Sequence, residues 1–310
     1  MSLPRTTASG ANRRRSAEPP MHLAIRRGSS VWQVAWRAVE KRPGLGGIPL
    51  VEGSEAGERK AQGAPAPEGP PRVFFLSDCH LGHDATPADR EREARVVRFL
   101  DSLDPRRDSL TIVGDLFDFW FAYRRAIPRA GFAVLARLHH LRQAGMPITF
   151  VAGNHDYWAL PFLRDELGLE VADGVLVRPI QGRRFFIAHG DGLGAGDRGY
   201  KLIKRVLRNP VAIALYRLIH PDLGIRLATL SSRISRRHSV PEPHLADRVY
   251  REVAVPAFGA GHDVVVLGHL HLPTLREEGG KAMVILGDWL VSHTYLRVEE
   301  SKLHLERFTS

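Results

Sequence analysis

Short apolar runs alternate with amphipathic segments from residue 72 onward. Each run is rich in β-prone residues and is bounded by turn-forming or polar residues, which predicts a buried strand of about 4–8 residues. A polar cluster follows each run directly. The five runs span residues 73–76, 110–113, 148–152, 184–188 and 264–267.

The segments between these runs carry the apolar spacing of helices. Helical patterns cover residues 88–103, residues 132–144 before Gly145, and residues 245–255 before Pro256. Glycine suits the left-handed position just past a helix, and proline cannot continue one. The alternation of strands and helices predicts α/β layering, in which ligands bind at the carboxyl ends of the strands.

Residues able to bind metal ions stand at the ends of the predicted strands. Asp78 and His80 are two positions apart, as are His269 and His271, and on an extended chain such pairs point to the same side. A single pair is better explained by an ordinary polar loop. The presence of Asp, His or Asn at all five strand ends favours a shared site. The candidate ligands are Asp78, His80, Asp115, Asn154, His189, His269 and His271.

This set combines nitrogen and oxygen donors and contains no sulfur. It exceeds the four ligands of a structural zinc site, which also favours thiolates. Two ions of Mn²⁺, Fe²⁺ or Zn²⁺ about 3.5–4 Å apart, bridged by a carboxylate, suit it better, and such a pair activates water and clamps a phosphoryl group. Gly114, Gly153, Gly190 and Gly268 adjoin candidate ligands, where a sharp turn or a close approach is expected.

Composition narrows the class of protein and the type of partner. The chain has 310 residues, 44% hydrophobic and 25% charged, which excludes a wholly disordered or coiled-coil protein. Its single cysteine, Cys79, excludes an intramolecular disulfide and is expected to be buried and to face away from the candidate ligands. The net charge of +10 points to an anionic partner. Residues 1–71 carry +5 and residues 192–240 carry +8, so the remainder is slightly acidic.

The polar clusters, in their order along the chain, resemble the motifs of the calcineurin-like metallophosphoesterases. The resemblance covers residues 72–298 and implies a four-layer α/β/β/α sandwich with a dinuclear metal centre. Residues 72–310 are then one metallophosphoesterase domain, with a helical lid inserted at residues 192–240. The matching motifs are Asp78-Cys79-His80, Gly114-Asp115, Gly153-Asn154-His155-Asp156, His189 and Gly268-His269-Leu270-His271.

The resemblance also assigns roles. His155 is placed to stabilise developing charge or to protonate the leaving group, Asp156 to orient His155, and Mn²⁺ is the expected metal. Asn154 is expected to contact substrate as well as metal. The implied ligands are Asp78, His80, Asp115 and His271 for one ion, and Asp115, Asn154, His189 and His269 for the other, with Asp115 bridging.

Within this family, flanking residues are similar to those of the UDP-2,3-diacylglucosamine pyrophosphatases of lipid A synthesis. That likeness implies cleavage at the α-phosphate of a nucleotide-activated lipid sugar, giving UMP and 2,3-diacylglucosamine 1-phosphate. His155 departs from the best-known form, which carries Arg there. A metallophosphoesterase acting on another phosphodiester or phosphomonoester is therefore the alternative. The similar stretches are residues 114–120, 189–194, 197–201 and 286–289.

The basic insertion predicts helices over residues 200–208, 211–219 and 223–237. The apolar helix at 211–219 is either a buried element or a slot for acyl chains. As a slot, it would be surrounded by basic residues that bind substrate phosphates: Lys201, Lys204, Arg205, Arg208 and Arg233. By the resemblance, Asp197, Tyr200 and Arg233 match positions that contact substrate. Basic residues around an apolar element also suit an anionic membrane surface.

Residues 1–71 predict a disordered basic tail, because they are rich in proline and lack apolar periodicity. No apolar run follows Arg13, Arg14 and Arg15, so an export signal is not expected, and no stretch is long enough to span a membrane. We therefore expect a cytoplasmic protein, peripheral on the cytoplasmic face of the inner membrane. No nucleic-acid partner is expected, and a metal-free scaffold is disfavoured because every ligand of the motif is present. The oligomeric state stays open.

Overall fold

The computed structural model describes residues 51–52, 69–82, 86–193, 205–228 and 244–309. The predicted tail, residues 1–71, therefore lies outside the described residues except at 51–52 and 69–71. Within the described part, no helix is long and apolar enough to cross a membrane.

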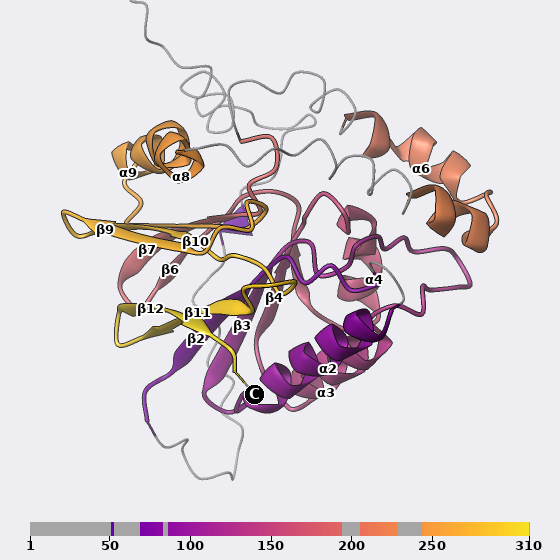
Figure 1. Ribbon diagram of the computed structural model, residues 1–310, viewed down its shortest axis with the longest axis horizontal. Helices are drawn as coiled ribbons and strands as arrows, with labels where there is room; N and C mark the ends of the chain where they lie inside the picture. The colour runs from indigo at the N-terminus through magenta and orange to yellow at the C-terminus, as the bar shows by residue number, and fades with distance from the viewer. Residues whose placement is uncertain (1–50, 53–68, 83–85, 194–204, 229–243, 310) are drawn as a thin grey trace, which may run out of the picture.

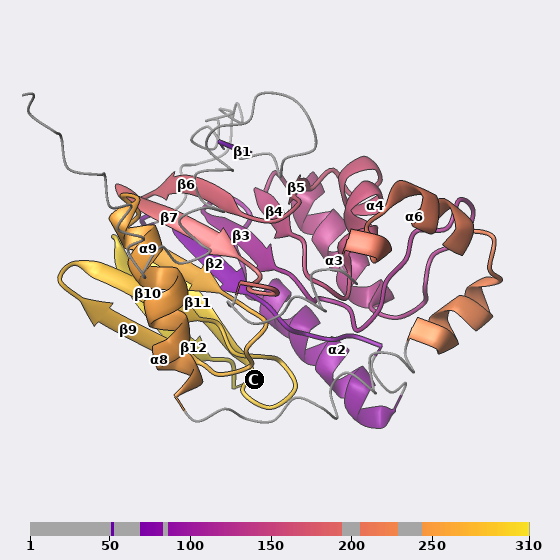
Figure 2. The ribbon, with the colours of Figure 1, turned by 90° about the horizontal axis from the view of Figure 1, so that it is seen from above.

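The strands form two mixed sheets (Figures 1 and 2). All five strands predicted from the apolar runs are present, as β2, β3, β4, β7 and β8. The first sheet has the order β12 (Lys302–Arg307), β11 (Thr294–Glu299), β2 (Arg72–Leu76), β3 (Asp108–Val113), β4 (Ile148–Val151) and β5 (Glu170–Ala172). The second has the order β1 (Val51–Glu52), β6 (Leu176–Ile180), β7 (Arg183–Ala188), β8 (Val264–Leu267), β10 (Lys281–Ile285) and β9 (Thr274–Glu278).

Parallel pairing brings the polar clusters together. In the first sheet β2, β3 and β4 are parallel neighbours, and in the second β7 and β8 are parallel, with Ala188 opposite Leu267. The carboxyl ends of these strands consequently lie at the same edge of each sheet. The segments that follow β2 and β3 stay hydrogen-bonded to each other. The amide of Asp78 donates to Gly114 O, and the amide of His80 donates to Asp115 O.

Three apolar cores separate four layers. The two sheets face each other across a core in which the rings of Phe75 and Phe185 stack with centroids 6.0 Å apart. A second core joins the first sheet to α2 (Pro87–Asp101), α3 (Phe132–Gln143) and α4 (Leu160–Asp165), and a third joins the other sheet to α9 (Val255–Gly259). Figure 1 shows α8 (Leu245–Val249) and α9 on the outer face of the second sheet. The predicted α/β/β/α sandwich is confirmed.

Local signals explain where the helices begin and end. Thr86 caps α2 by accepting from the amide of Asp89, and Pro87 occupies the first turn. Gly145 has a φ of +95° just past α3, as predicted. Pro256, however, does not end a helix, because a π-helical turn, Tyr250–Ala254, precedes α9 and puts the proline in the first turn of α9.

The described part of the insertion, residues 205–228, lies beside α4 in both views (Figures 1 and 2). It contains α6 (Pro210–Tyr216), and residues 205–207 and 221–228 are also helical. None of the α6 side chains is buried, and Val211 and Leu215 are 67% and 61% exposed. The interpretation of this segment as a buried helix is therefore wrong.

Candidate metal centre

Five of the seven candidate ligands lie in strained backbone just beyond the strand ends. Asp78, His80, Asp115, His269 and His271 all have φ between +45° and +67°. The left-handed region costs a residue with a Cβ about 1–3 kcal/mol. The prediction that Asp78 and His80 point to the same side because the chain is extended is therefore wrong. The backbone turns at each of these residues, and the two turns bring the side chains together.

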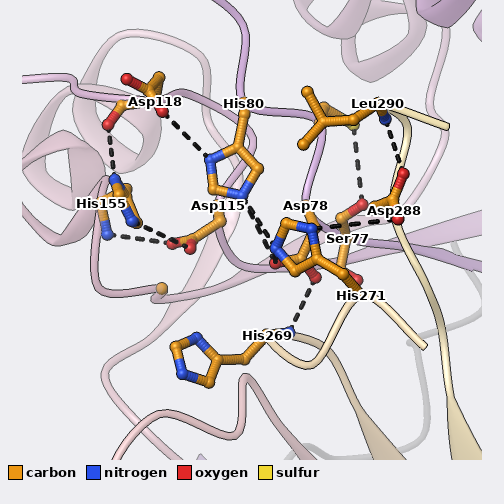
Figure 3. Close-up of polar contacts among 12 residues, drawn as sticks. Ser77, Asp78, His80, Asp115, Asp118, His155, His269, His271, Asp288 and Leu290 are labelled. Atoms are coloured by element: carbon orange, nitrogen blue, oxygen red, sulfur yellow. Dashed lines mark hydrogen bonds and ion pairs between the residues drawn. The ribbon is translucent and has the colours of Figure 1, made fainter. Parts of the chain in front are cut away.

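One group brings together Asp78, His80 and His271, with ligand atoms within 4.8 Å of one another (Figure 3). The Nε2 atoms of His80 and His271 face each other at 3.3 Å. Asp78 Oδ1 lies 3.3 Å from His271 Nε2 and 3.7 Å from His80 Nε2. Three donor atoms therefore converge on one point from two strand ends.

A second group brings together Asp115, His189 and His269. His189 Nε2 lies 3.2 Å from Asp115 Oδ2 and 3.1 Å from Asn154 Oδ1. His189 Nδ1 lies 2.8 Å from Val113 O, and because a carbonyl only accepts, Nδ1 carries the hydrogen. In the neutral ring the lone pair is then on Nε2, which faces Asp115.

The two groups are contiguous. A third group, His80, Asp115 and His155, shares His80 with the first and Asp115 with the second. His155 Nε2 lies 3.9 Å from Asp115 Oδ2, and Figure 3 shows the imidazole of His155 pointing toward that carboxylate. Asp115 is therefore placed between the two groups, as a bridging ligand must be.

Burial and mutual contact set the charges of the site. Although burial raises it, contacts from His271 and His80 hold the pKa of the Asp78 carboxyl far below its usual value. The pKa of Asp115 is also lowered, by the charges of His189 and His155 against the effect of burial. Burial lowers the pKa of His189, but the charge and hydrogen bond of Asp115, together with the charges of Asp78 and Asp191, outweigh burial and raise that pKa to about 10. The two buried carboxylates and the neighbouring imidazoles thus favour each other's charged forms.

These residues fit a pair of divalent cations. Buried carboxylates require a positive countercharge, and the imidazoles that supply it here are metal ligands when deprotonated. The facing Nε2 atoms of His80 and His271 suit a shared ion. Mixed nitrogen and oxygen donors without sulfur match borderline ions.

Gly153 allows the loop after β4 to approach Asp115 closely. A Cβ on Gly153 would lie 2.1 Å from Asp115 Oδ1 and 2.4 Å from its amide nitrogen. The amide of the next histidine, His155, donates to the same Oδ1 at 3.0 Å. Gly153 is therefore required by a close approach rather than by a positive φ.

The predicted partner of His155 needs correction. His155 Nδ1 lies 2.7 Å from the carbonyl oxygen of Asp118, which orients the ring. Asp156 instead accepts hydrogen bonds from the amides of Leu116 at 2.7 Å and Gly153 at 3.2 Å. It braces the two loops against each other because its buried oxygens face backbone N–H groups. Burial and the nearby charge of Asp115 raise the pKa of Asp156 to about 7.

Sequence reasoning missed two side chains next to the ligands. Asp288 Oδ2 lies 3.9 Å from His271 Nδ1, and its position after Gly287 at the end of β10 is the same signal that marked Asp115. Arg92, buried on α2, donates to His80 O at 2.7 Å, and no periodic pattern distinguishes it from the other arginines of that helix. Asp118 is also buried beside the site, and its Oδ1 lies 3.4 Å from His80 Nδ1.

Cys79 is fully buried in the core between the first sheet and its helices, as predicted. Burial raises the pKa of its thiol well above the usual value. Four of the predicted substrate contacts lie outside the described residues and stay predictions; they are Asp197, Tyr200, Lys201 and Arg233.

Comparison with known proteins decides the family. The sequence model of the calcineurin-like phosphoesterases matches residues 71–280. This chain belongs to the calcineurin-like phosphoesterase family. Like its family, it is a metal-dependent hydrolase.

Relatives of this calcineurin-like phosphoesterase align over most of their length. The UDP-2,3-diacylglucosamine hydrolase of Porphyromonas gingivalis is 33% identical over 76% of this chain and 97% of that protein. The proteins of that name from Nitrosococcus oceani and Stenotrophomonas maltophilia are 28% and 30% identical, over 87% and 94% of their lengths. They align with 70% and 73% of this chain. A solved phosphoesterase from E. coli, Yfce, aligns at 18% identity with a TM-score of 0.39, too low to add to the assignment.

Proposed function

We propose that this protein cleaves the pyrophosphate bond of UDP-2,3-diacylglucosamine to UMP and 2,3-diacylglucosamine 1-phosphate, as a step in lipid A synthesis. The observation that carries the proposal is the contiguity of two candidate metal groups through Asp115. Two adjacent cations suit a phosphoryl centre, because they stabilise the attacking and leaving oxygens of an in-line displacement.

Seven side chains would hold the ions. When bound, the ions would supply activation of water and neutralisation of phosphoryl charge. Mn²⁺ is the ion that we propose, because the donors are imidazole, carboxylate and amide. The ligands would be Asp78, His80, Asp115 and His271 for one ion, and Asp115, Asn154, His189 and His269 for the other.

His155 is the proposed proton donor to the leaving phosphate. Its Nδ1 donates to Asp118 O, so Nε2 is the ring nitrogen that faces the site and Asp115. A proton on Nε2 gives the doubly protonated, cationic ring. That form stabilises negative charge before it transfers the proton, and neutral His155 remains afterwards. Asp156 acts indirectly, because it holds in place the two loops that carry His155 and Asp115.

The relatives support the substrate, because the named UDP-2,3-diacylglucosamine hydrolases share 28–33% identity with this chain over most of their length. The insertion, which we propose as the lid, supports a lipid. Residues 205–228 expose large apolar side chains near the loops of the centre; these are Val206, Leu207, Val211, Leu215, Leu218, Leu223 and Leu227. A lid for a polar ester has no need of that surface.

We also propose that this face rests on an anionic membrane. Arg205, Arg217 and Arg226 accompany the apolar side chains, and Asp222 is the single acidic residue within 205–228. Each arginine near a charged lipid surface contributes about 1 kcal/mol of attraction. A lipid-linked substrate would enter from that surface.

Turnover in ¹⁸O-labelled water tests the reaction. With Mn²⁺ and UDP-2,3-diacylglucosamine in mixed micelles, we expect the label in UMP, because attack is at the α-phosphate. Asp115→Asn should abolish turnover, whereas Asp101→Asn, on the surface of α2, should not. Label in the lipid phosphate would contradict the position of attack. Turnover of a soluble diester, with none of the lipid nucleotide, would contradict the substrate.

A further inference from the structure

Arg208 joins the basic insertion to the loop that carries Asn154. It follows a short helical stretch, residues 205–207, and precedes Asn209, the N-cap of α6. The segment was expected to present Arg208 to substrate phosphates. Its side chain is instead only 18% exposed and faces the domain.

The guanidinium of Arg208 is held from two sides by partners outside the insertion. Its Nη1 donates to Asp173 Oδ1 at 2.9 Å, and its plane lies over the ring of Tyr157 with 4.0 Å to the centroid. The hydroxyl of Tyr157 donates to the other oxygen of Asp173 at 3.2 Å. Arginine suits this place because a planar cation both stacks on a ring and binds a carboxylate.

The same guanidinium reaches the metal centre. Nη2 of Arg208 donates to the carbonyl oxygen of Gly153 at 3.3 Å. That carbonyl belongs to the peptide that leads into Asn154, whose Oδ1 lies 3.1 Å from His189 Nε2. A charged donor on the carbonyl fixes the plane of this peptide, and hence the direction in which Asn154 leaves the backbone.

Neighbouring contacts tie the insertion to the segment after Asn154 and to the loop after β3. Trp158 Nε1 donates to Leu207 O at 3.1 Å, and the rings of Phe121 and Tyr216 lie 4.7 Å apart. Asn209 caps α6 by accepting from the amide of Val211 at 2.8 Å. The direction of α6 is therefore set at the residue next to Arg208.

We infer that Arg208 is a positioning residue that fixes the Asn154 ligand and the insertion together. One guanidinium bonds the Gly153 carbonyl while it holds the start of α6 against Tyr157 and Asp173. Metal affinity and the placement of the insertion are consequently coupled, and loss of Arg208 weakens both. The inference rests on the proposed function through the metal role of Asn154, and it does not depend on the identity of the substrate.

Calorimetric titration of the full chain with Mn²⁺ tests the metal half of this inference. We expect Arg208→Gln to weaken Mn²⁺ binding by about 10-fold or more, the range seen when a ligand-orienting partner is lost. Arg142→Gln is the matched control, because Arg142 Nε also donates to a carbonyl, Gly168 O, at 2.8 Å, remote from the centre. Arg208→Lys keeps the positive charge but lacks the planar set of N–H donors, so it should show a smaller loss of Mn²⁺ affinity.

Fluorine NMR of the metal-free chain labelled with 5-fluorotryptophan tests the other half. Trp158→Phe assigns the Trp158 resonance, which should shift or broaden in Arg208→Gln because Leu207 is no longer held. It should stay unchanged in Arg142→Gln. The circular dichroism of each variant shows whether it folds, and if Arg208→Gln does not, Arg208→Lys is judged by the same criteria.

Each outcome decides the inference. Mn²⁺ affinity within twofold of wild type, an unchanged Trp158 resonance, or an equal loss in Arg142→Gln would overturn it while leaving the proposed function intact. A wild-type chain that binds no Mn²⁺ would overturn the proposed metal centre, and this inference with it. Weakened binding together with a perturbed Trp158 resonance, both specific to Arg208, supports it.

Discussion

His155 Nδ1 donates to the carbonyl oxygen of Asp118 at 2.7 Å, so the orientation of this imidazole is set by backbone. Asp118 itself follows β3 by only a few residues and its amide donates to Leu81 O, which fixes the carbonyl relative to the first sheet. The ring therefore keeps its direction toward Asp115 whichever side chains line the rest of the site.

Replacing His155 should slow the chemical step more than it disturbs the metals. We expect His155→Ala to lower kcat on the lipid nucleotide by about 10²–10⁴-fold, the usual contribution of a positioned acid. Steady-state kinetics in saturating Mn²⁺ measure the effect, with the exposed His139→Ala as control. An unchanged kcat would remove His155 from the mechanism.

Replacing Gly153 should lower stability and Mn²⁺ affinity through a steric clash with Asp115. The Cβ of Gly153→Ala would lie 2.1 Å from Asp115 Oδ1, so the loop or the carboxylate must move. We expect a loss of about 1–3 kcal/mol in the free energy of unfolding, as for other overpacked sites, and weaker Mn²⁺ binding. Gly259→Ala in α9 meets nothing within 4 Å and should be neutral or stabilising in urea unfolding. Equal stabilities of the two variants would contradict the close approach.

Removing metal should destabilise the whole domain, because ions bind the folded ligand set and not the unfolded chain. Mn²⁺ at about 1,000 times its Kd should raise the free energy of unfolding by about 4 kcal/mol per site, and chelation should reverse this. Thermal unfolding with and without chelator measures it. Asp115→Asn, which removes the proposed bridging carboxylate, should abolish most of the difference.

His262 should make stability depend on pH below about 6.5. Burial, reinforced by the charge of Arg184, lowers the pKa of His262. The unfolded chain then binds more protons than the folded one in this range, so stability falls as pH drops through 6.5, by at most about 1.4 kcal/mol per pH unit. The difference in unfolding free energy between wild type and His262→Gln isolates this group from other histidines. A difference independent of pH between 5 and 7 would refute the assignment.

The exposed face of the insertion should govern binding to anionic vesicles. Leu218 is 81% exposed, and Leu218→Asp should reduce co-sedimentation with phosphatidylglycerol vesicles severalfold, since it adds a repelled charge. Val255 on α9 is 47% exposed at the other end of the molecule in both views, and Val255→Asp should have no effect. Equal effects of the two substitutions would argue against a dedicated membrane face.

The strand ends were predictable because buried apolar runs and the polar residues after them are local features. Their convergence follows from parallel pairing, which places Asp78, Asp115 and Asn154 at one edge. The backbone conformation was not predictable, since left-handed φ at His80 or His271 depends on contacts between distant loops. The role of Arg208 was missed for the same reason: its partners lie 35 and 55 residues away.

The left-handed backbone at the ligand positions has a consequence for laboratory evolution. Glycine adopts φ near +50° without penalty, so His271→Gly relieves strain at a position whose side chain is 33% exposed. In metal-depleted conditions, where the ligands contribute no binding free energy, selection for heat resistance alone would consequently enrich glycine at these candidate ligand positions. A screen for thermostable variants must therefore be run with Mn²⁺ present or score turnover in the same round, or it will accumulate stable and inactive proteins.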